Sequence, residues 1–250
     1  MKRTEISQGV NQYTFEPSGN RRYGNNVIAV ICNDKAILID TGYGNQTEEI
    51  VTDLSNTGIS IEGVILSHYH EGHIQGLKKL FGVTVYGSSY YQQTLDRWLP
   101  TEEQKYYIPT VGIDKNHKII FGEHVLELIH NPGHSICTLF IKINEKYLYI
   151  ADELMYSPNG EMILPSVTKK DIINHYVSVH NLPKYNQYIF IPGHGELIDE
   201  AHQIARDTKN ACQYLCEILS HDEEITVDQA TKNCTCNFLH KDRHENIYIT

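Results

Sequence analysis

Short apolar runs separated by turn-forming residues alternate along this chain with longer segments of helical periodicity. Two apolar runs that flank a short polar or glycine-containing turn predict a β-hairpin. Three such pairs occur, at 27–32 with 35–39, at 118–121 with 124–129, and at 138–143 with 146–151. Further strands are expected at 10–15, 64–66, 83–86, 188–191 and, at the end of the chain, 246–250.

Apolar residues recur with helical spacing in the segments between these strands. They predict helices at 46–55, 74–80, 88–99, 168–182, 199–220 and 226–233. Both halves of the chain mix the two kinds of element, and no internal repeat or low-complexity linker separates them. The pattern favours two packed sheets with helices outside and one shared edge where the loops meet.

The composition adds limits to this picture. The chain has 250 residues, of which 40% are hydrophobic and 21% are charged, so it can bury a substantial core as one large or two small domains. A net charge of −10 argues against a broad surface for binding nucleic acid. The N-terminal stretch has no apolar segment like that of a signal peptide, and no apolar run approaches the roughly 18 residues of a membrane span. We therefore expect a cytoplasmic protein that contacts no membrane.

The cysteines do not indicate a disulfide framework, because they are too sparse. They lie at positions 32, 137, 212, 216, 234 and 236. Cys32 and Cys137 fall in apolar runs and are expected to be buried thiols. The four C-terminal cysteines lack the paired Cys-x-x-Cys spacing of a structural zinc site, so core thiols are the favoured interpretation.

The most informative stretch runs from Ser67 to His73 and places His68, His70 and His73 within six residues. It follows the apolar run 64–66 and precedes a predicted helix, so these histidines occupy a loop at a strand end, where α/β sheets carry their chemistry. Neutral imidazole is the commonest protein ligand for zinc and also suits iron, copper and nickel. The stretch therefore predicts a metal site, with a solvated histidine-rich loop as the alternative.

Three more polar residues follow predicted strands. His134 and His194 each come after a Pro-Gly pair, and Asp152 closes the strand at 146–151. Proline fixes the chain direction and glycine removes bulk beside a ligand. Each feature alone is weak, but together with the histidine stretch they predict one metal centre.

This constellation resembles the metallo-β-lactamase-fold hydrolase superfamily, in its glyoxalase II-like or lactonase-like branch. The family motif reads His-x-His-x-Asp-His, followed by a distant His, a bridging Asp and a last His. The segment 38–42, Leu-Ile-Asp-Thr-Gly, is also similar to the family's strand-end turn, and the resemblance covers nearly the whole chain. It implies an α/β fold, a four-layer αββα sandwich, formed by a single domain over 1–250 in which 199–250 is mostly helical.

The resemblance also implies a binuclear metal site at one edge of the sandwich. One metal would be held by His68, His70 and His134, the second by His73 and His194, and Asp152 would bridge both. Two zinc ions are expected, with a single ion as the alternative and iron or manganese left open.

The chain departs from the family at Gly72, where the family has an aspartate that binds the second metal. Glu71 is a candidate replacement, because glutamate is longer than aspartate and Gly72 makes the loop pliable. Glu71 occupies the variable position of the motif, however. Without it, the second set keeps two histidines and one carboxylate, which is still a workable ligand set.

The function implied is hydrolysis of a small ester, thioester or lactone by a metal-activated water, with Glu71 or Asp152 as the catalytic carboxylate that orients it. Two alternatives remain open. One is a degenerate metal-binding or regulatory protein, and the other is a di-iron redox protein, which His70 argues against. The expected partner is a small-molecule substrate, and the sequence leaves its identity and the oligomeric state open.

Side chains outside the motif are weaker candidates. Two loops, near 87–117 and 153–167, are expected to line the substrate pocket. The tyrosines of the first loop are candidates for that lining or for the core, and they are Tyr90, Tyr91, Tyr106 and Tyr107. Three C-terminal histidines, His221, His240 and His244, are expected to be exposed.

Overall fold

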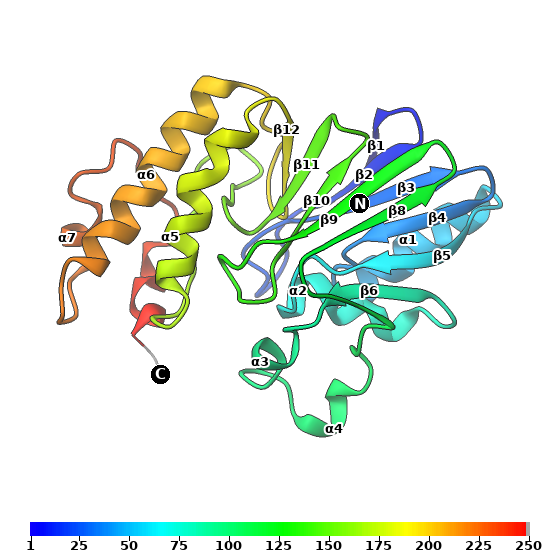
Figure 1. Cartoon of the computed structure of the whole chain (residues 1–250), viewed down its shortest axis with the longest axis horizontal. Helices are drawn as coiled ribbons and strands as arrows, with labels where there is room; N and C mark the ends of the chain where they lie inside the picture. The colour runs from blue at the N-terminus through cyan, green and yellow to red at the C-terminus, as the bar shows by residue number, and fades with distance from the viewer. Residues whose placement is uncertain (249–250) are drawn as a thin grey trace.

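Two mixed β-sheets pack face to face in this protein, and helices cover the outer face of each sheet (Figure 1). The computed structural model describes residues 1–248. The order of helix, sheet, sheet and helix confirms the four-layer αββα sandwich expected from the sequence. The three predicted hairpins also form.

The first sheet has seven strands in chain order, antiparallel from β1 to β4 and parallel from β4 to β7. Its strands are β1 (Lys2–Ser7), β2 (Val10–Phe15), β3 (Asn25–Cys32), β4 (Lys35–Ile39), β5 (Ser60–Ile65), β6 (Thr84–Ser88) and β7 (Val111–Ile113). The helical elements on this side are α1 (Gly44–Asn56), α2 (Glu71–Ile74), η1 (Gln75–Lys79), α3 (Gln92–Leu95) and α4 (Thr101–Gln104).

The second sheet has the order β12-β11-β10-β9-β8, and only its β11–β12 pair is parallel. Its strands are β8 (Asn116–Phe121), β9 (His124–His130), β10 (Leu139–Ile143), β11 (Tyr147–Ala151) and β12 (Ile189–Pro192). The helical elements here are α5 (Ile172–Asn181), η2 (Leu182–Tyr185), α6 (Ala201–Leu219), α7 (Val227–Thr231) and η3 (Lys241–Ile247).

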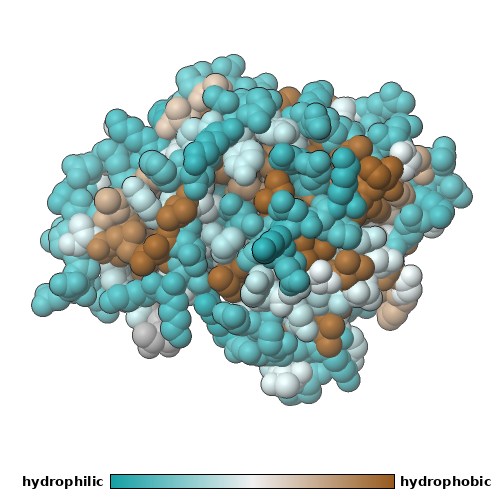
Figure 2. All heavy atoms as spheres, in the orientation of Figure 1, coloured by the Kyte–Doolittle hydropathy of each residue, from teal (hydrophilic) through white to brown (hydrophobic). Residues whose placement is uncertain are grey.

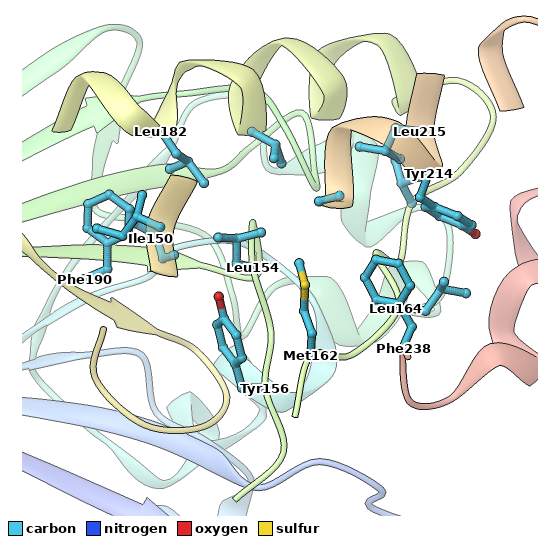
Figure 3. Close-up of a cluster of buried hydrophobic side chains, with 14 of the residues drawn as sticks. Ile150, Leu154, Tyr156, Met162, Leu164, Leu182, Phe190, Tyr214, Leu215 and Phe238 are labelled. Atoms are coloured by element: carbon cyan, nitrogen blue, oxygen red, sulfur yellow. The ribbon is translucent and has the colours of Figure 1, made fainter. Parts of the chain in front are cut away.

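The central strands are apolar on both faces because both faces are covered. In β3, Ile28 and Val30 pack between the sheets, while Val27 and Ala29 face the layer of α1. Side chains alternate across a strand in this way, so one apolar run feeds two cores. On the other outer face, Figure 3 shows Ile150 and Phe190 in the same apolar cluster as side chains from the C-terminal helices.

Polar residues cover most of the face seen in Figure 2, where apolar side chains appear as separate patches. No helix within residues 1–248 combines the length and apolar character needed to cross a bilayer.

Several strands of the two sheets end at one edge of the sandwich. β4 runs into Asp40 and β11 ends at Ala151, and both residues have left-handed backbone, with φ of 60° and 50°. Such a conformation costs a non-glycine residue about 1 kcal/mol or more and is concentrated at functional sites. The pairing of β11 with β12 also shifts register between Tyr149 and Ala151. The chain is therefore locally distorted where it delivers Asp152 to this edge.

Some predicted elements are wrong. The segment 88–99 contains only the four-residue helix α3, with turns on both sides of it, and Trp98 near the end of the segment donates its ring N–H to the carbonyl of Tyr69. Residues 246–247 belong to the 3-10 helix η3 rather than to the predicted strand 246–250, and residues 249–250 of that prediction lie outside the described residues. β1 and β7 are not among the predicted strands, since β1 is largely polar and β7 has only three residues.

Ile141 lies fully buried between the sheets, whereas Ile120 on β8 is 64% exposed. We expect Ile141→Ala to lower the free energy of unfolding by about 2–5 kcal/mol, because it removes buried surface and leaves a cavity. Ile120→Ala is the matched control and should change it by about 0.5 kcal/mol or less. Urea denaturation measures both, and equal effects would contradict the assigned packing.

Candidate metal centre

Five histidines and one aspartate meet at the shared edge of the sheets. They come from the loop after β5, from α2, and from the chain that follows β9, β11 and β12. They are His68, His70, His73, His134, Asp152 and His194. All six residues named as metal ligands by the sequence are thus brought to one place, although they span more than half of the chain.

Their ring and carboxylate atoms form two overlapping groups, in which all ligand atoms lie within 4.8 Å of one another. The first group is His68, His70 and His134, and the nearest approach in it is 2.9 Å between His70 Nδ1 and His134 Nε2. The second group is His68, His73 and Asp152, with 3.3 Å between His73 Nε2 and Asp152 Oδ1.

His194 joins the second group through Asp152. Its Nε2 lies 3.4 Å from Asp152 Oδ2, and the Nε2 atoms of His68 and His134 lie 3.7 Å from the same oxygen. One carboxylate therefore contacts both groups of imidazoles.

The donor set fits a metal on two observations. His68 Nε2, His73 Nε2 and Asp152 Oδ1 are buried and lack a hydrogen-bond partner, although buried polar atoms are nearly always paired. Burial also lowers the pKa of His68 and His134 well below the usual range, and that of His70 to about 4. These three side chains are therefore neutral imidazoles, the form that binds metals.

The buried carboxylate of Asp40 orients one member of the site. It accepts hydrogen bonds from the backbone N–H and the hydroxyl of Ser67, from the Tyr149 hydroxyl and from His73 Nδ1, each at 2.7 Å. The bond to Nδ1 turns His73 Nε2 toward Asp152. Burial alone would lower the pKa of His73, but the carboxylates of Asp152 and Asp40 raise it to about 10. The sequence pattern indicates Asp40 only as part of a strand-end turn and does not predict this role.

The glycines of both Pro-Gly-His triplets are required by close approach. A Cβ atom at Gly193 would lie 2.5 Å from Asp152 Oδ1, and one at Gly133 would lie 2.1 Å from Glu153 Oε1. Glu153 is buried behind the site, and its Oε1 accepts the backbone N–H of His134 at 2.8 Å. Glu153 is a second positioning residue that the sequence analysis did not predict, although its place next to Asp152 in the sequence is a signal for it.

The side chain of Glu71, the candidate replacement for the family aspartate at position 72, points away from the donor groups. The Glu71 side chain is exposed and accepts a hydrogen bond from Gln75 at 2.8 Å, so its carboxylate stands outside both donor groups. Beside Gly72, a Cβ atom would lie 3.3 Å from Asn25 Nδ2 and 3.4 Å from the Tyr43 hydroxyl oxygen. Tyr43 and Asn25 thus narrow the space next to the position where the family aspartate would begin.

A cavity of about 370 Å³ opens over the donor groups. The loop expected at 153–167 contributes Met155, Ser166 and Val167, and the loop 87–117 contributes only Arg97. None of the four candidate tyrosines in the loop 87–117 lines the cavity, and Tyr90 instead stacks on the ring of His130.

The remaining sequence candidates lie elsewhere. Cys137 is buried and Cys32 is half-buried, and no metal-binding group within residues 1–248 includes the C-terminal cysteines. The exposed position expected for His244 is wrong, because it is buried between the Tyr214 hydroxyl at 2.9 Å and the carbonyl of Ile225 at 2.7 Å.

Comparison with known proteins agrees with this geometry. Residues 20–206 match the sequence model of the metallo-beta-lactamase superfamily. The chain belongs to this superfamily. It is therefore a member of a superfamily of metal-dependent hydrolases, with candidate metal-binding groups of histidine and aspartate.

Individual members of the superfamily are distant in sequence. A beta-lactamase-like protein 2 homolog of Caenorhabditis elegans is 24% identical over 81% of this chain and 68% of its own length. The hydroxyacylglutathione hydrolase GloC of Haemophilus influenzae is 24% identical over 64% of this chain and 80% of its own. The metallo-beta-lactamase structure from Pontibacter korlensis superposes with a TM-score of 0.67 at 19% identity, over 85% of this chain and 98% of that one. At this identity, the structural similarity to the Pontibacter korlensis protein shows only that the two chains share a fold.

Asp40→Asn tests the carboxylate that holds His73. We expect the affinity for a metal ion to fall about 10- to 100-fold, as is typical when an outer carboxylate partner of a metal ligand is lost. Competition with a chromophoric chelator measures this affinity. Asp53→Asn is the control, since Asp53 accepts hydrogen bonds from Tyr13 and Arg3 away from the site. Equal affinities in wild type and Asp40→Asn would contradict the assigned role.

Proposed function

We propose that this protein is a zinc-dependent hydrolase that cleaves a small ester, thioester or lactone with water. The observation that carries the proposal is the meeting of five imidazoles and one carboxylate, several with orphaned buried atoms, at the floor of an open cavity. Zinc bound there would acidify a water molecule and polarise the carbonyl group of the substrate.

The two donor groups would divide this work. His68, His70 and His134 supply three neutral imidazoles, the set that leaves a fourth position open in catalytic zinc sites. His73, His194 and Asp152 would hold a second ion. In the absence of an aspartate at position 72, this second group has two imidazoles and one carboxylate, one ligand fewer than the family motif supplies.

Asp152 is the carboxylate best placed to orient the attacking water. It lies among the imidazoles and lines the cavity, and its Oδ1 has no hydrogen-bond partner within the described chain. The His194 and His73 rings beside it hold its pKa well below the usual range despite its burial, so it stays an acceptor. Glu71 lines the same cavity, but its carboxylate faces solvent and Gln75.

The thioester arm of the proposal is supported by the relatives. Several of them are named hydroxyacylglutathione hydrolases, and an acyl group carried by glutathione is a thioester. The solved metallo-beta-lactamases share only the fold at this level of identity, so they do not favour a β-lactam substrate.

His70→Ala tests the hydrolase directly. On a panel of thioester, lactone and ester substrates, we expect zinc-loaded wild type to hydrolyse at least one, and His70→Ala to lose about 100-fold or more of kcat/KM because an imidazole of the first group is removed. His202→Ala is the control, since His202 is exposed and 3.1 Å from Glu200 on the surface. Activity that survives His70→Ala would contradict the proposal, as would zinc-loaded wild type that is inactive on the whole panel.

Gly72→Asp tests the missing carboxylate of the second group. We expect the added carboxylate to tighten binding of the second zinc by about tenfold or more, with Tyr43 and Asn25 yielding by a few tenths of an ångström. Gly72→Asn has the same size without the charge and should bind the second ion like wild type. Equilibrium dialysis with metal analysis measures both, and equal affinities for Asp and Asn at this position would contradict the expectation.

A further inference from the structure

A second cavity of about 380 Å³ adjoins the candidate metal centre. The two cavities share a wall made of Tyr23, Tyr43, His194, Arg243 and Asn246. The rest of the second cavity is lined by Asn20, Arg21, Arg22, Asn25 and Asp242. We call this second cavity the arginine compartment; it is built from the segment before β3 and from η3, at opposite ends of the sequence.

The charge of the arginine compartment is opposite to that of the chain. Arg21, Arg22 and Arg243 face a single carboxylate, Asp242, in a protein whose net charge is −10. A cavity lined by one sign of charge concentrates ligands of the other sign. The compartment therefore favours an anion although the whole protein repels anions.

The guanidinium groups are available to such an anion. Four of the six arginines form ion pairs within residues 1–248, and these pairs are Arg3–Asp53, Arg22–Asp242, Arg97–Asp171 and Arg206–Asp207. The other two, Arg21 and Arg243, both line the arginine compartment.

Within the described residues, the side chains of these two arginines donate hydrogen bonds only to neutral oxygens. Arg21 donates to Asn45 Oδ1 at 2.7 Å, and Arg243 donates to the Tyr23 hydroxyl. Each guanidinium has five N–H donors, so most remain free. The Arg22–Asp242 pair is more than half exposed on both sides and is a weak competitor.

Aromatic rings hold these arginines beside the metal centre. The guanidinium of Arg21 lies over the ring of Tyr43 at 3.7 Å, and that of Arg243 lies 5.1 Å from the ring of Tyr23. The Tyr23 ring in turn lies 5.4 Å from the ring of His194. A stacked guanidinium loses little further freedom on binding, and its planar fork matches the oxygens of a carboxylate or phosphate.

We propose that the arginine compartment binds a carboxylate or phosphate group of the substrate while the bond to be cleaved lies over the metal centre. The inference rests on the proposed hydrolase function for calling the ligand a substrate. It narrows the substrate class to acyl compounds that carry an anionic group.

Anion binding is the first test, and it does not depend on hydrolysis. Succinate and inorganic phosphate are titrated separately into zinc-loaded, full-length protein by calorimetry. We expect the Arg21→Gln/Arg243→Gln double variant to bind the better of the two at least about tenfold more weakly, because two charged hydrogen-bonding partners are lost. Lys118→Gln, an exposed charge change on β8, should bind like wild type. The tighter of the two anions identifies carboxylate or phosphate as the group recognised.

Kinetics is the second test. A thioester with a free carboxylate is compared with the same thioester whose carboxylate is a primary amide. We expect wild type to prefer the acid by about tenfold or more in kcat/KM, and the double variant to lose that preference with its zinc content unchanged. Arg243→Lys should retain part of the preference, since it keeps the charge without the fork.

The outcomes separate the two proposals. Equal anion affinities in wild type and the double variant, or an acid preference that survives in the double variant, would overturn the arginine compartment as an anion site. Anion binding that depends on the arginines, in a protein inactive on both thioesters and on the whole panel of esters and lactones, would support the site and overturn the hydrolase proposal.

Discussion

The buried carboxylate of Asp40 joins both sheets to the candidate metal centre. It takes hydrogen bonds from the loop after β5, from Tyr149 on β11 and from His73, so it fixes one imidazole relative to two sheets at once. A buried carboxylate is costly unless its oxygens are paired, and here four donors at 2.7 Å pair them. The backbone of Asp40 is left-handed at the same point.

The close packing of backbone and carboxylates sets the shape of the site. Gly193 and Gly133 leave room for Asp152 and Glu153, and neither position can hold a Cβ atom without displacing a carboxylate. Each Pro-Gly-His triplet therefore has a glycine for a steric reason and a candidate metal ligand at its third position. Asp152 in turn lies within 3.7 Å of four imidazole rings.

The two adjoining cavities are lined by groups of different charge. The donor groups supply imidazole and carboxylate at the centre, and the neighbouring wall presents guanidinium groups. Tyr23 belongs to both, because its ring approaches His194 and its hydroxyl accepts a bond from Arg243. Gly72, where the chain departs from the family motif, also lies beside the wall that the two cavities share. The Tyr43 hydroxyl is close to the position that a Cβ atom of residue 72 would occupy, and the guanidinium of Arg21 lies over the Tyr43 ring.

The sequence by itself determined the layers and the local chemistry. Alternating apolar runs predicted the hairpins, and a run that is apolar on both faces, such as 27–32, requires cover on both sides. Strand-end spacing and the family resemblance together selected the six residues that meet at one edge. These features are local, or repeat at a fixed period, so they can be read along the chain.

Only the tertiary structure decided which side chains contact and orient those residues. Asp40 reaches His73 across 33 positions, and Glu71 is turned to Gln75 rather than inward. Arg243 meets Tyr23 across 220 positions, and His244 is buried by Tyr214 and Ile225. Such contacts depend on how separate elements pack, and side-chain orientation and long-range pairing leave no period in the sequence.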